Sequence, residues 1–225
     1  MSDPNLDNCD IEPIHIPGSI QNHGFLIALD GELVVRYCSE NIQEFLNITA
    51  SAILGKPLHE VEQLNNGPQH DLEALVRFSS LQDTVINQNG FSYQLNGQSF
   101  NIIIHFHNGY HIIDFEPAIS NLSHDLQSLI GKSLSEILSD KKMENLLNNA
   151  AQQVKKIIGY DRVMVYKFHE DGHGEVVAEA KADNYESWLG LHYPASDIPK
   201  QARALYQINL VRLIADVNTT PSALV

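Results

Sequence analysis

The two cysteines of the chain lie in surroundings that give them different chemistry. Cys9 belongs to a polar lead segment, where a thiol has little to pack against and its thiolate could act as a nucleophile. Cys38 ends an apolar run, so we expect a buried small hydrophobe. Two cysteines are too few for a disulfide framework and fit a reducing compartment. Most lone tail cysteines have no chemical role, so a role for Cys9 must come from its neighbours.

The loop Pro194–Pro199 holds a serine and an aspartate between prolines. Prolines restrict the backbone, and acceptors that are held in place need not reorganise around a ligand. Ser196 or Asp197 also suits the N-cap of the helix expected at Gln201–Tyr206. Capping and ligand binding are compatible, and the residues alone leave both open.

Other polar side chains have ordinary structural readings. Tyrosines are usually core or half-buried aromatics with locally bonded hydroxyls, and a strand arginine is usually a surface charge. His105, His107 and His111 could converge as metal ligands, but no carboxylate or cysteine joins them at a ligand spacing. We therefore expect a solvated sheet face there. Phosphate-loop and Gly-x-Ser-x-Gly motifs do not occur, so nucleotide and serine-hydrolase sites lack support.

Composition bounds the class of protein. The chain is 43% hydrophobic and 19% charged, which is ordinary globular composition. Its 28 acidic and 14 basic residues give a net charge of −14, which disfavours nucleic acids and anionic membranes as partners. No apolar run approaches the ~20 residues that span a bilayer. The N-terminus lacks the features of a secretory signal, so we expect a cytoplasmic protein.

The first half of the chain predicts strands separated by short helices. His23–Leu29 and Leu33–Cys38 indicate a hairpin. Asn41–Glu44 has the spacing of a capping box that opens a short helix, and apolar spacing indicates another helix near Asp71–Leu81.

Residues Phe91–Phe115 predict a three-strand antiparallel meander. The dipeptides Asn96-Gly97 and Asn108-Gly109 favour tight turns between three runs of strand-forming residues. Two strands, helices and then three strands are typical of a PAS domain, although several small α+β folds share this order.

A Ser- and Asn-rich stretch after Glu116-Pro117 is a plausible linker. The elements expected after it are a helix ended by Gly159, a hairpin, a short helix and a further strand, at residues 143–158, 162–168 with 175–182, 201–206 and 210–215. Helix, hairpin and a long connection are how a GAF domain begins.

Three segments resemble those of bacteriophytochromes, in the same order and at the same spacing. They are CDIEPIHIPGSIQNHG at 9–24, DRVMVYKF at 161–168, and PASDIP at 194–199 followed by ARALY at 202–206. One such segment would be a weak signal, but three in order cover nearly the whole chain and leave little room for coincidence.

The resemblance implies an α+β fold with a PAS domain, an antiparallel sheet with flanking helices, followed by a partial GAF domain. The expected boundaries are a lead segment at 1–12, PAS at 13–117, a linker at 118–139 and the first part of GAF at 140–225. It also implies a knot, in which the chain near Ile20 threads a long GAF insertion that begins near Asp216. A sheet of three strands is short of a GAF core, so we expect the domain to be cut off at Val225.

The resemblance also implies a cofactor, biliverdin IXα, joined to Cys9 by a thioether. The main-chain carbonyl of Asp197 would accept hydrogen bonds from the pyrrole N–H groups, and its carboxylate would lie near the D ring. Tyr166 and Tyr193 would pack around that ring, and Tyr206 would hydrogen-bond near Asp197. The remaining residues of the implied site are a propionate partner, Arg212, and neighbours or apolar wall residues: Met164, Val176, Ser196, Ile198, Pro199 and Ile20.

The implied function is red/far-red light reception, as the photosensory part of a two-component signalling protein. The implied partners are a second copy of the parent protein and a response regulator, with the bilin as ligand. We expect no catalysis by this fragment, although its parent would be a sensor histidine kinase. The alternatives are a PAS–GAF small-molecule-sensing or dimerisation module without bilin, and a metal enzyme that uses the histidine-rich hairpin. Cys9 and Asp197 argue against the plain module, because such a module needs neither.

Overall fold

The computed structural model describes residues 13–65, 71–80, 90–118, 130, 132–134, 136–137, 142–208 and 211–225. The chain divides into two compact units. One, the five-stranded unit, falls within His15–Ser120 and Arg212–Val225. The other, the three-stranded unit, falls within Asn121–Val211. No helix in the described ranges has the length and apolar character that crossing a bilayer requires.

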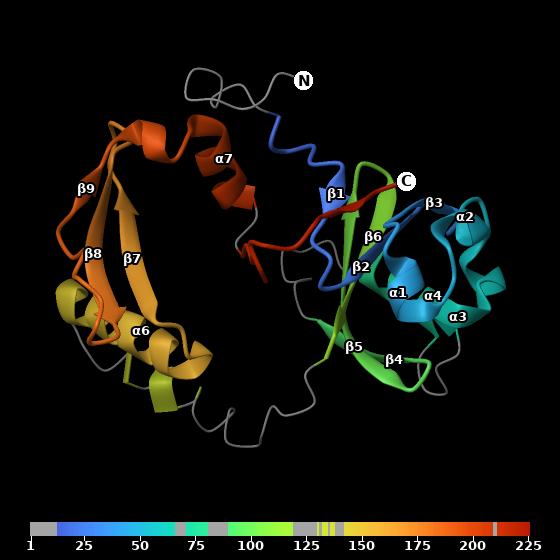
Figure 1. The fold of residues 1–225 in the computed structure, drawn as a ribbon, viewed down its shortest axis with the longest axis horizontal. Helices are drawn as coiled ribbons and strands as arrows, with labels where there is room; N and C mark the ends of the chain where they lie inside the picture. Colours follow the sequence, from blue (N-terminus) through green and yellow to red (C-terminus); the bar gives the residue numbers. More distant parts are fainter. Residues whose placement is uncertain are drawn as a thin grey trace. The chain divides into compact units, whose positions relative to one another are not determined.

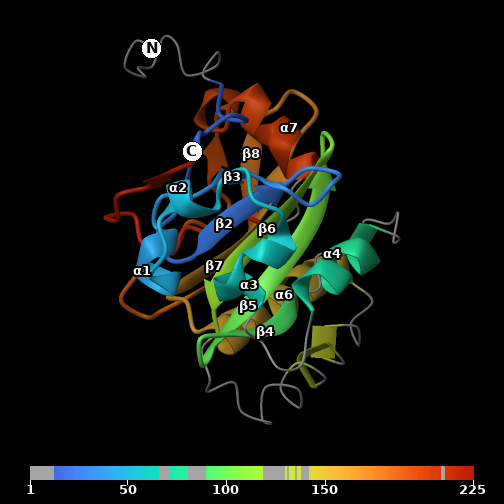
Figure 2. The ribbon, with the colours of Figure 1, turned by 90° about the vertical axis from the view of Figure 1, so that its right-hand side faces the viewer.

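The five-stranded unit is built on an antiparallel sheet with the strand order β3-β2-β6-β5-β4 (Figures 1 and 2). Its strands are β2 (Phe25–Leu29), β3 (Val35–Cys38), β4 (Phe91–Leu95), β5 (Gln98–His107) and β6 (Tyr110–Pro117). Helices gather on one face of the sheet: α1 (Ile42–Leu46), α2 (Ala50–Ile53), η2 (Leu58–Glu60), α3 (Glu62–Asn65) and α4 (Leu72–Ser80). The core lies between the two layers.

Alternation along the strands produces this core. Phe25, Phe100 and Phe115 point to the helix side and are at most 1% exposed. The rings of Phe25 and Phe115 stack with centroids 4.4 Å apart. The predicted PAS-type order of elements is therefore confirmed.

Both predicted tight turns of the meander are confirmed. Asn96 and Gly97 have φ of 49° and 78°, and Asn108 and Gly109 have φ of 50° and 84°. Two consecutive positive φ angles define the type I′ turn that matches the twist of a hairpin. Asparagine and glycine occupy these positions because they adopt this region most readily.

The short helix α1 forms as predicted, but the prediction of a capping box at its start is wrong. Asn41 makes no side-chain cap hydrogen bond. Its Nδ2 instead donates to the carbonyl of Gly24 at 2.8 Å. Its backbone N–H, which Glu44 would have bonded, donates to Ser222 Oγ at 3.0 Å. Tertiary partners have replaced the local cap.

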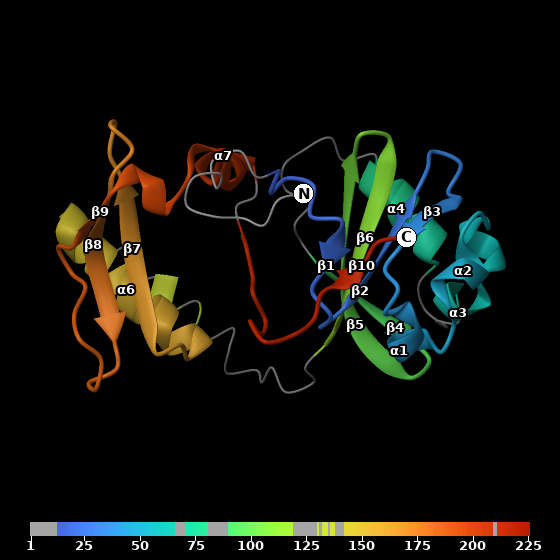
Figure 3. The ribbon, with the colours of Figure 1, turned by 45° about the horizontal axis from the view of Figure 1, so that its top comes forward.

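Segment 212–225 packs against the five-stranded unit. Strand β1 (Ser19–Ile20) pairs antiparallel with β10 (Ser222–Ala223), as Figure 3 shows. The backbones of Cys38 and Val225 exchange two hydrogen bonds of 2.9 Å. The chain's last residues thus lie between β1 and the end of β3.

The strand predicted at Leu210–Ala215 is wrong over residues 211–215, and Leu210 lies outside the described residues. Backbone groups here bond to a side chain rather than to a neighbouring strand. Gln21 donates from Nε2 to the carbonyl of Leu213 at 2.5 Å and accepts the N–H of Ala215 at 2.8 Å.

The three-stranded unit contains the antiparallel sheet β7-β8-β9, with β7 at Arg162–Phe168, β8 at Gly174–Lys181 and β9 at His192–Tyr193. Helix α6 (Met143–Ile158) packs against β7 and β8 and ends, as predicted, at Gly159 with φ of 73°. The turn η3 (Ala195–Asp197) and helix α7 (Lys200–Ile208) follow. The predicted hairpin and both predicted helices of this unit are confirmed, but its third strand is β9.

Candidate functional site

A β-bulge decides which side chains share a face of the β7–β8 hairpin. Met164 pairs with Glu179, whereas Tyr166 pairs with Val176, and the register shifts between Val165 and Tyr166. Alternate residues of β7 share one face, and directly opposed residues share a face as well. The extra residue in β8 therefore brings Val176 to the same face as Met164 and Tyr166.

This face lies opposite the one that α6 covers. Val165 and its partner Ala178 occupy the covered face, where Ala178 is fully buried and Ala151 of α6 is 1% exposed. Met164 and Phe168, on the other face, are 37% and 41% exposed. The three sequence-predicted residues Met164, Tyr166 and Val176 are thus brought together on the face away from α6.

The ring of Tyr166 lies directly over Gly174. A Cβ at Gly174 would overlap the ring carbons and the hydroxyl of Tyr166. Two more aromatic rings surround it, with centroids 5.2 Å away for Phe168 and 6.0 Å away for Tyr193. Gly174 pairs with Tyr193 across β8 and β9, so the glycine makes room for an aromatic cluster at this end of the sheet.

The carboxylate of Asp197 acts electrostatically on the hydroxyl of Tyr166. Burial raises the pKa of Tyr166, and the carboxylate of Asp197 and the side chain of Tyr193 raise it further. The guanidinium of Arg203 acts in the opposite direction. Tyr166 therefore remains protonated at neutral pH, and its hydroxyl is available as a hydrogen-bond donor.

Arg203 joins the hairpin turn to this loop. It donates from Nη1 to the carbonyl of Gly172 at 3.0 Å and to that of Ala195 at 3.2 Å. A Cβ at Gly172 would lie 3.2 Å from Arg203 Nη1 and 3.3 Å from Ala195 Cβ, so the turn and the loop are in close contact. Arg203 had no predicted role; its only signal in the sequence is an arginine within the first helical turns after the proline-bounded loop.

The loop itself turns at η3, where the N–H of Asp197 donates to the carbonyl of Pro194 at 3.1 Å. Ser196 and Asp197 are exposed, whereas Ile198 and Pro199 are half-buried. Tyr206, on α7, is 42% exposed. Within the described residues no hydrogen bond joins Tyr206 to Asp197.

Three predicted site residues lie outside the described part of the three-stranded unit. Cys9 lies outside the described residues. Ile20, which lines a pocket there, and the exposed Arg212 belong to the five-stranded unit. Cys38 is fully buried as expected, and burial raises the pKa of its thiol to about 12, which makes it a poor nucleophile.

The three histidines of the meander do not share a face. His105 and His107 pair with Ile112 and Tyr110, whereas His111 pairs with Phe106, one residue out of phase. His111 is only 8% exposed, so the expectation of a solvated face is wrong for it. A site built on all three side chains is ruled out by this geometry.

Comparison with known proteins shows the family to which this chain belongs. The family model described as "PAS fold" matches residues 9–118. The chromophore-binding domain of wild-type Stigmatella aurantiaca phytochrome is 32% identical and superimposes with a TM-score of 0.82, over 96% of this chain and 72% of that one. The chain belongs to the phytochrome family.

Two relatives show the range of this family. A bacteriophytochrome of Pseudomonas aeruginosa is 38% identical over 96% of this chain, and phytochrome B of Arabidopsis thaliana is 36% identical over 91%. The chain spans 29% of the first relative and 19% of the second. The phytochrome likeness thus confirms the predicted family and the mixed helix-and-sheet fold, and leaves the activity of a whole protein to be proposed.

Proposed function

We propose that this chain is the photosensory region of a red/far-red light receptor that holds a linear tetrapyrrole. The observation that carries the proposal is the grouping of Met164, Tyr166 and Val176 on the sheet face away from α6, with Asp197 acting on Tyr166. Membership of the phytochrome family supports it, because the matched domains are named for chromophore binding.

The residues fit such a ligand by their chemistry. A tetrapyrrole offers a flat apolar surface, N–H donors and carbonyl acceptors. The aromatic cluster around Tyr166 matches the flat surface. The absence of a Cβ at Gly174 leaves the space that the Tyr166 ring occupies. Asp197 supplies acceptors, and the protonated Tyr166 supplies a donor.

The ligand would be biliverdin IXα, held through Cys9. Cys9 would hold the ligand by a thioether, because its thiolate would add across the A-ring vinyl group with uptake of one proton. Arg212 would pair with a propionate, because its guanidinium matches a carboxylate with two parallel donors. When bound, the bilin supplies light absorption and the isomerisation that follows it.

The rest of the assignment follows from the same likeness. We assign residues 1–12 to a lead segment, 13–117 to PAS, 118–139 to a linker and 140–225 to a GAF-type domain. Ser196, Ile198, Pro199 and Tyr206 would lie around the ligand, and Ile20 at the crossing of a knot. The parent protein would be a cytoplasmic, dimeric sensor histidine kinase with a response regulator as partner.

The test is covalent pigment attachment. A protein that carries these residues and continues past Val225, as the relatives do, is mixed with biliverdin and run on a denaturing gel in the presence of zinc. We expect fluorescence to migrate with the protein. A colourless and non-fluorescent protein would favour the alternative, a sensing or dimerisation module without bilin.

A further inference from the structure

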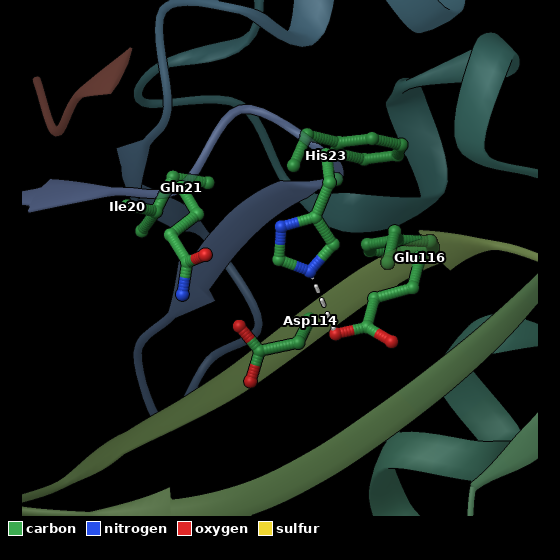
Figure 4. Close-up of a pocket in the computed structure, with 8 residues that line it drawn as sticks. Ile20, Gln21, His23, Asp114 and Glu116 are labelled. Atoms are coloured by element: carbon green, nitrogen blue, oxygen red, sulfur yellow. Dashed lines mark hydrogen bonds and ion pairs between the residues drawn. The ribbon is translucent and has the colours of Figure 1, made fainter. Parts of the chain in front are cut away.

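A pocket of about 200 Å³ opens in the five-stranded unit, where residues 20–25 meet the end of β6. Figure 4 shows Gln21, His23, Asp114 and Glu116 around it, with the ring of His23 directed at the two carboxylates. Nothing in the proposed light-sensing role uses these side chains. Two acids and an imidazole in one small pocket form a cluster whose charge depends on pH.

The contacts within the cluster are incomplete. His23 Nε2 lies 3.2 Å from Glu116 Oε1, and this contact joins the segment before β2 to β6. His23 Nδ1 is buried and has no hydrogen-bond partner among the described residues. Asp114 has a weaker partner, since its Oδ2 lies 3.8 Å from Nδ1 of His105 on β5.

Asp114 is the group that titrates near neutrality. Partial burial, which leaves 38% of the side chain exposed, and the neighbouring Glu116 raise the pKa of Asp114 to about 6, and His23 acts in the opposite direction. His105 offers little charge in compensation, because burial and the adjacent His107 lower the pKa of His105 and favour its neutral form. Asp114 therefore gains or loses its charge within the pH range of a living cell.

Residues next to His23 contact both β6 and segment 212–225. Gly24 lies so close to the carbonyl of Phe115 that a Cβ at Gly24 would overlap it. The backbone just before β2 therefore packs tightly against β6. Gln21 bonds the backbone of Leu213 and Ala215 through both ends of its amide. Gln21, which lines the pocket together with His23, therefore connects this pocket to segment 212–225.

We propose that this pocket is a proton-operated latch, which holds segment 212–225 firmly in mild acid and loosens it in mild alkali. In acid Asp114 is neutral, so the pocket does not hold two charged carboxylates. In alkali Asp114 is charged beside the carboxylate of Glu116, so like charges share one pocket. The link to light sensing rests on the proposed function, because segment 212–225 carries Arg212; the latch itself needs no bilin.

The sign follows from linkage. The pKa of Asp114 in the folded chain lies above its usual value of 3.8. The extra stability is then fully present below about pH 3.8 and is lost as the pH rises through about 6. Attachment of segment 212–225 should follow the same course.

The experiment is amide hydrogen exchange by NMR on the chain without bilin, at about pH 5.5 and about pH 7.5, with rates corrected for intrinsic exchange. The reporters are the N–H groups of Leu224 and Val225, which bond to Gly18 and Cys38. We expect their protection to fall about fivefold at the higher pH, because the repulsion within one like-charge pair near a surface is of this size. Amides at the centre of β5 serve as the internal reference and should not change.

Two variants separate the latch from general stability. Asp114→Asn should keep acid-level protection at both pH values, and the matched exposed control Glu32→Gln should behave as the wild type. Glu116→Gln, which removes the second carboxylate of the pocket, should lessen the fall in protection between the two pH values, because the like-charge pair no longer forms. Equal protection of the wild type at the two pH values, or an Asp114→Asn variant that retains its pH dependence, would overturn the proposal. Neither result would bear on bilin binding, so failure of the latch and failure of the proposed function are distinguishable.

Discussion

The ring of Tyr166 lies over the α-carbon of Gly174, in the position that any β-carbon at residue 174 would need. Because the ring is also the group that Asp197 acts on, one glycine decides where the hydroxyl of a candidate ligand-binding residue can point. Substitution of this residue should therefore affect the site and the hairpin together.

Gly174→Ala should displace the Tyr166 ring and weaken bilin binding. Overpacking a well-filled position typically costs about 1–3 kcal/mol, so the three-stranded unit should lose stability by a similar amount. Thermal unfolding and biliverdin retention on a desalting column would measure the two effects. Gly31→Ala is the matched control, because a Cβ there meets no atom within 4 Å. Wild-type pigment retention by Gly174→Ala would contradict the proposed placement of the ligand.

Cys9→Ser should still bind biliverdin but release it on denaturation, because only the covalent bond survives loss of the fold. A denaturing gel with zinc fluorescence checks this. Cys38→Ala is the control, since the buried Cys38 thiol has a pKa raised to about 12 and should not replace Cys9. If the denatured serine variant kept its pigment, attachment would have to be assigned to another residue.

Asp197→Ala should retain bilin yet slow the conversion from the red- to the far-red-absorbing form. A hydrogen bond to a charged group is worth about 1.5–3 kcal/mol, which corresponds to a rate loss of at least about tenfold. Flash spectroscopy would give the rate. Asp183→Ala removes another exposed carboxylate of the same unit and should leave the rate unchanged. Photoconversion at the wild-type rate in Asp197→Ala would remove Asp197 from the mechanism.

Arg203→Ala should loosen the contact between the hairpin turn and the Pro194–Pro199 loop, since both carbonyl partners of the guanidinium lose a donor. We expect faster hydrogen exchange in residues 172–174 and 195–197, by about tenfold for two lost hydrogen bonds. Lys200→Ala, on the same helix, is the control. Unchanged exchange in both segments would show that other contacts hold the loop.

Local chemistry explains which elements could be predicted. The type I′ turns at Asn96-Gly97 and Asn108-Gly109 follow from the residues that tolerate positive φ, and the end of α6 follows from Gly159. The side chains that line one face of β7 follow from alternation along that strand. Val176 joins Tyr166 because of a register shift, which depends on strand pairing and leaves no period in the sequence.

Partners far apart in the chain account for what the sequence analysis missed. Asn41 bonds to Gly24 and Ser222 instead of capping its own helix, and Gln21 takes the backbone groups that a strand at residues 211–215 would have used. Such bonds arise only once the fold has brought the segments together. Arg203 was overlooked for the same reason, since its two acceptors come from a turn and a loop.

The most direct test of the central claim is a light-induced difference spectrum. The protein, extended past Val225 and incubated with biliverdin, is freed of unbound pigment and illuminated alternately with red and far-red light. We predict a bound pigment whose absorption shifts reversibly between two forms over repeated cycles. A protein that binds no biliverdin, or one whose bound pigment shows no reversible change, would contradict the account.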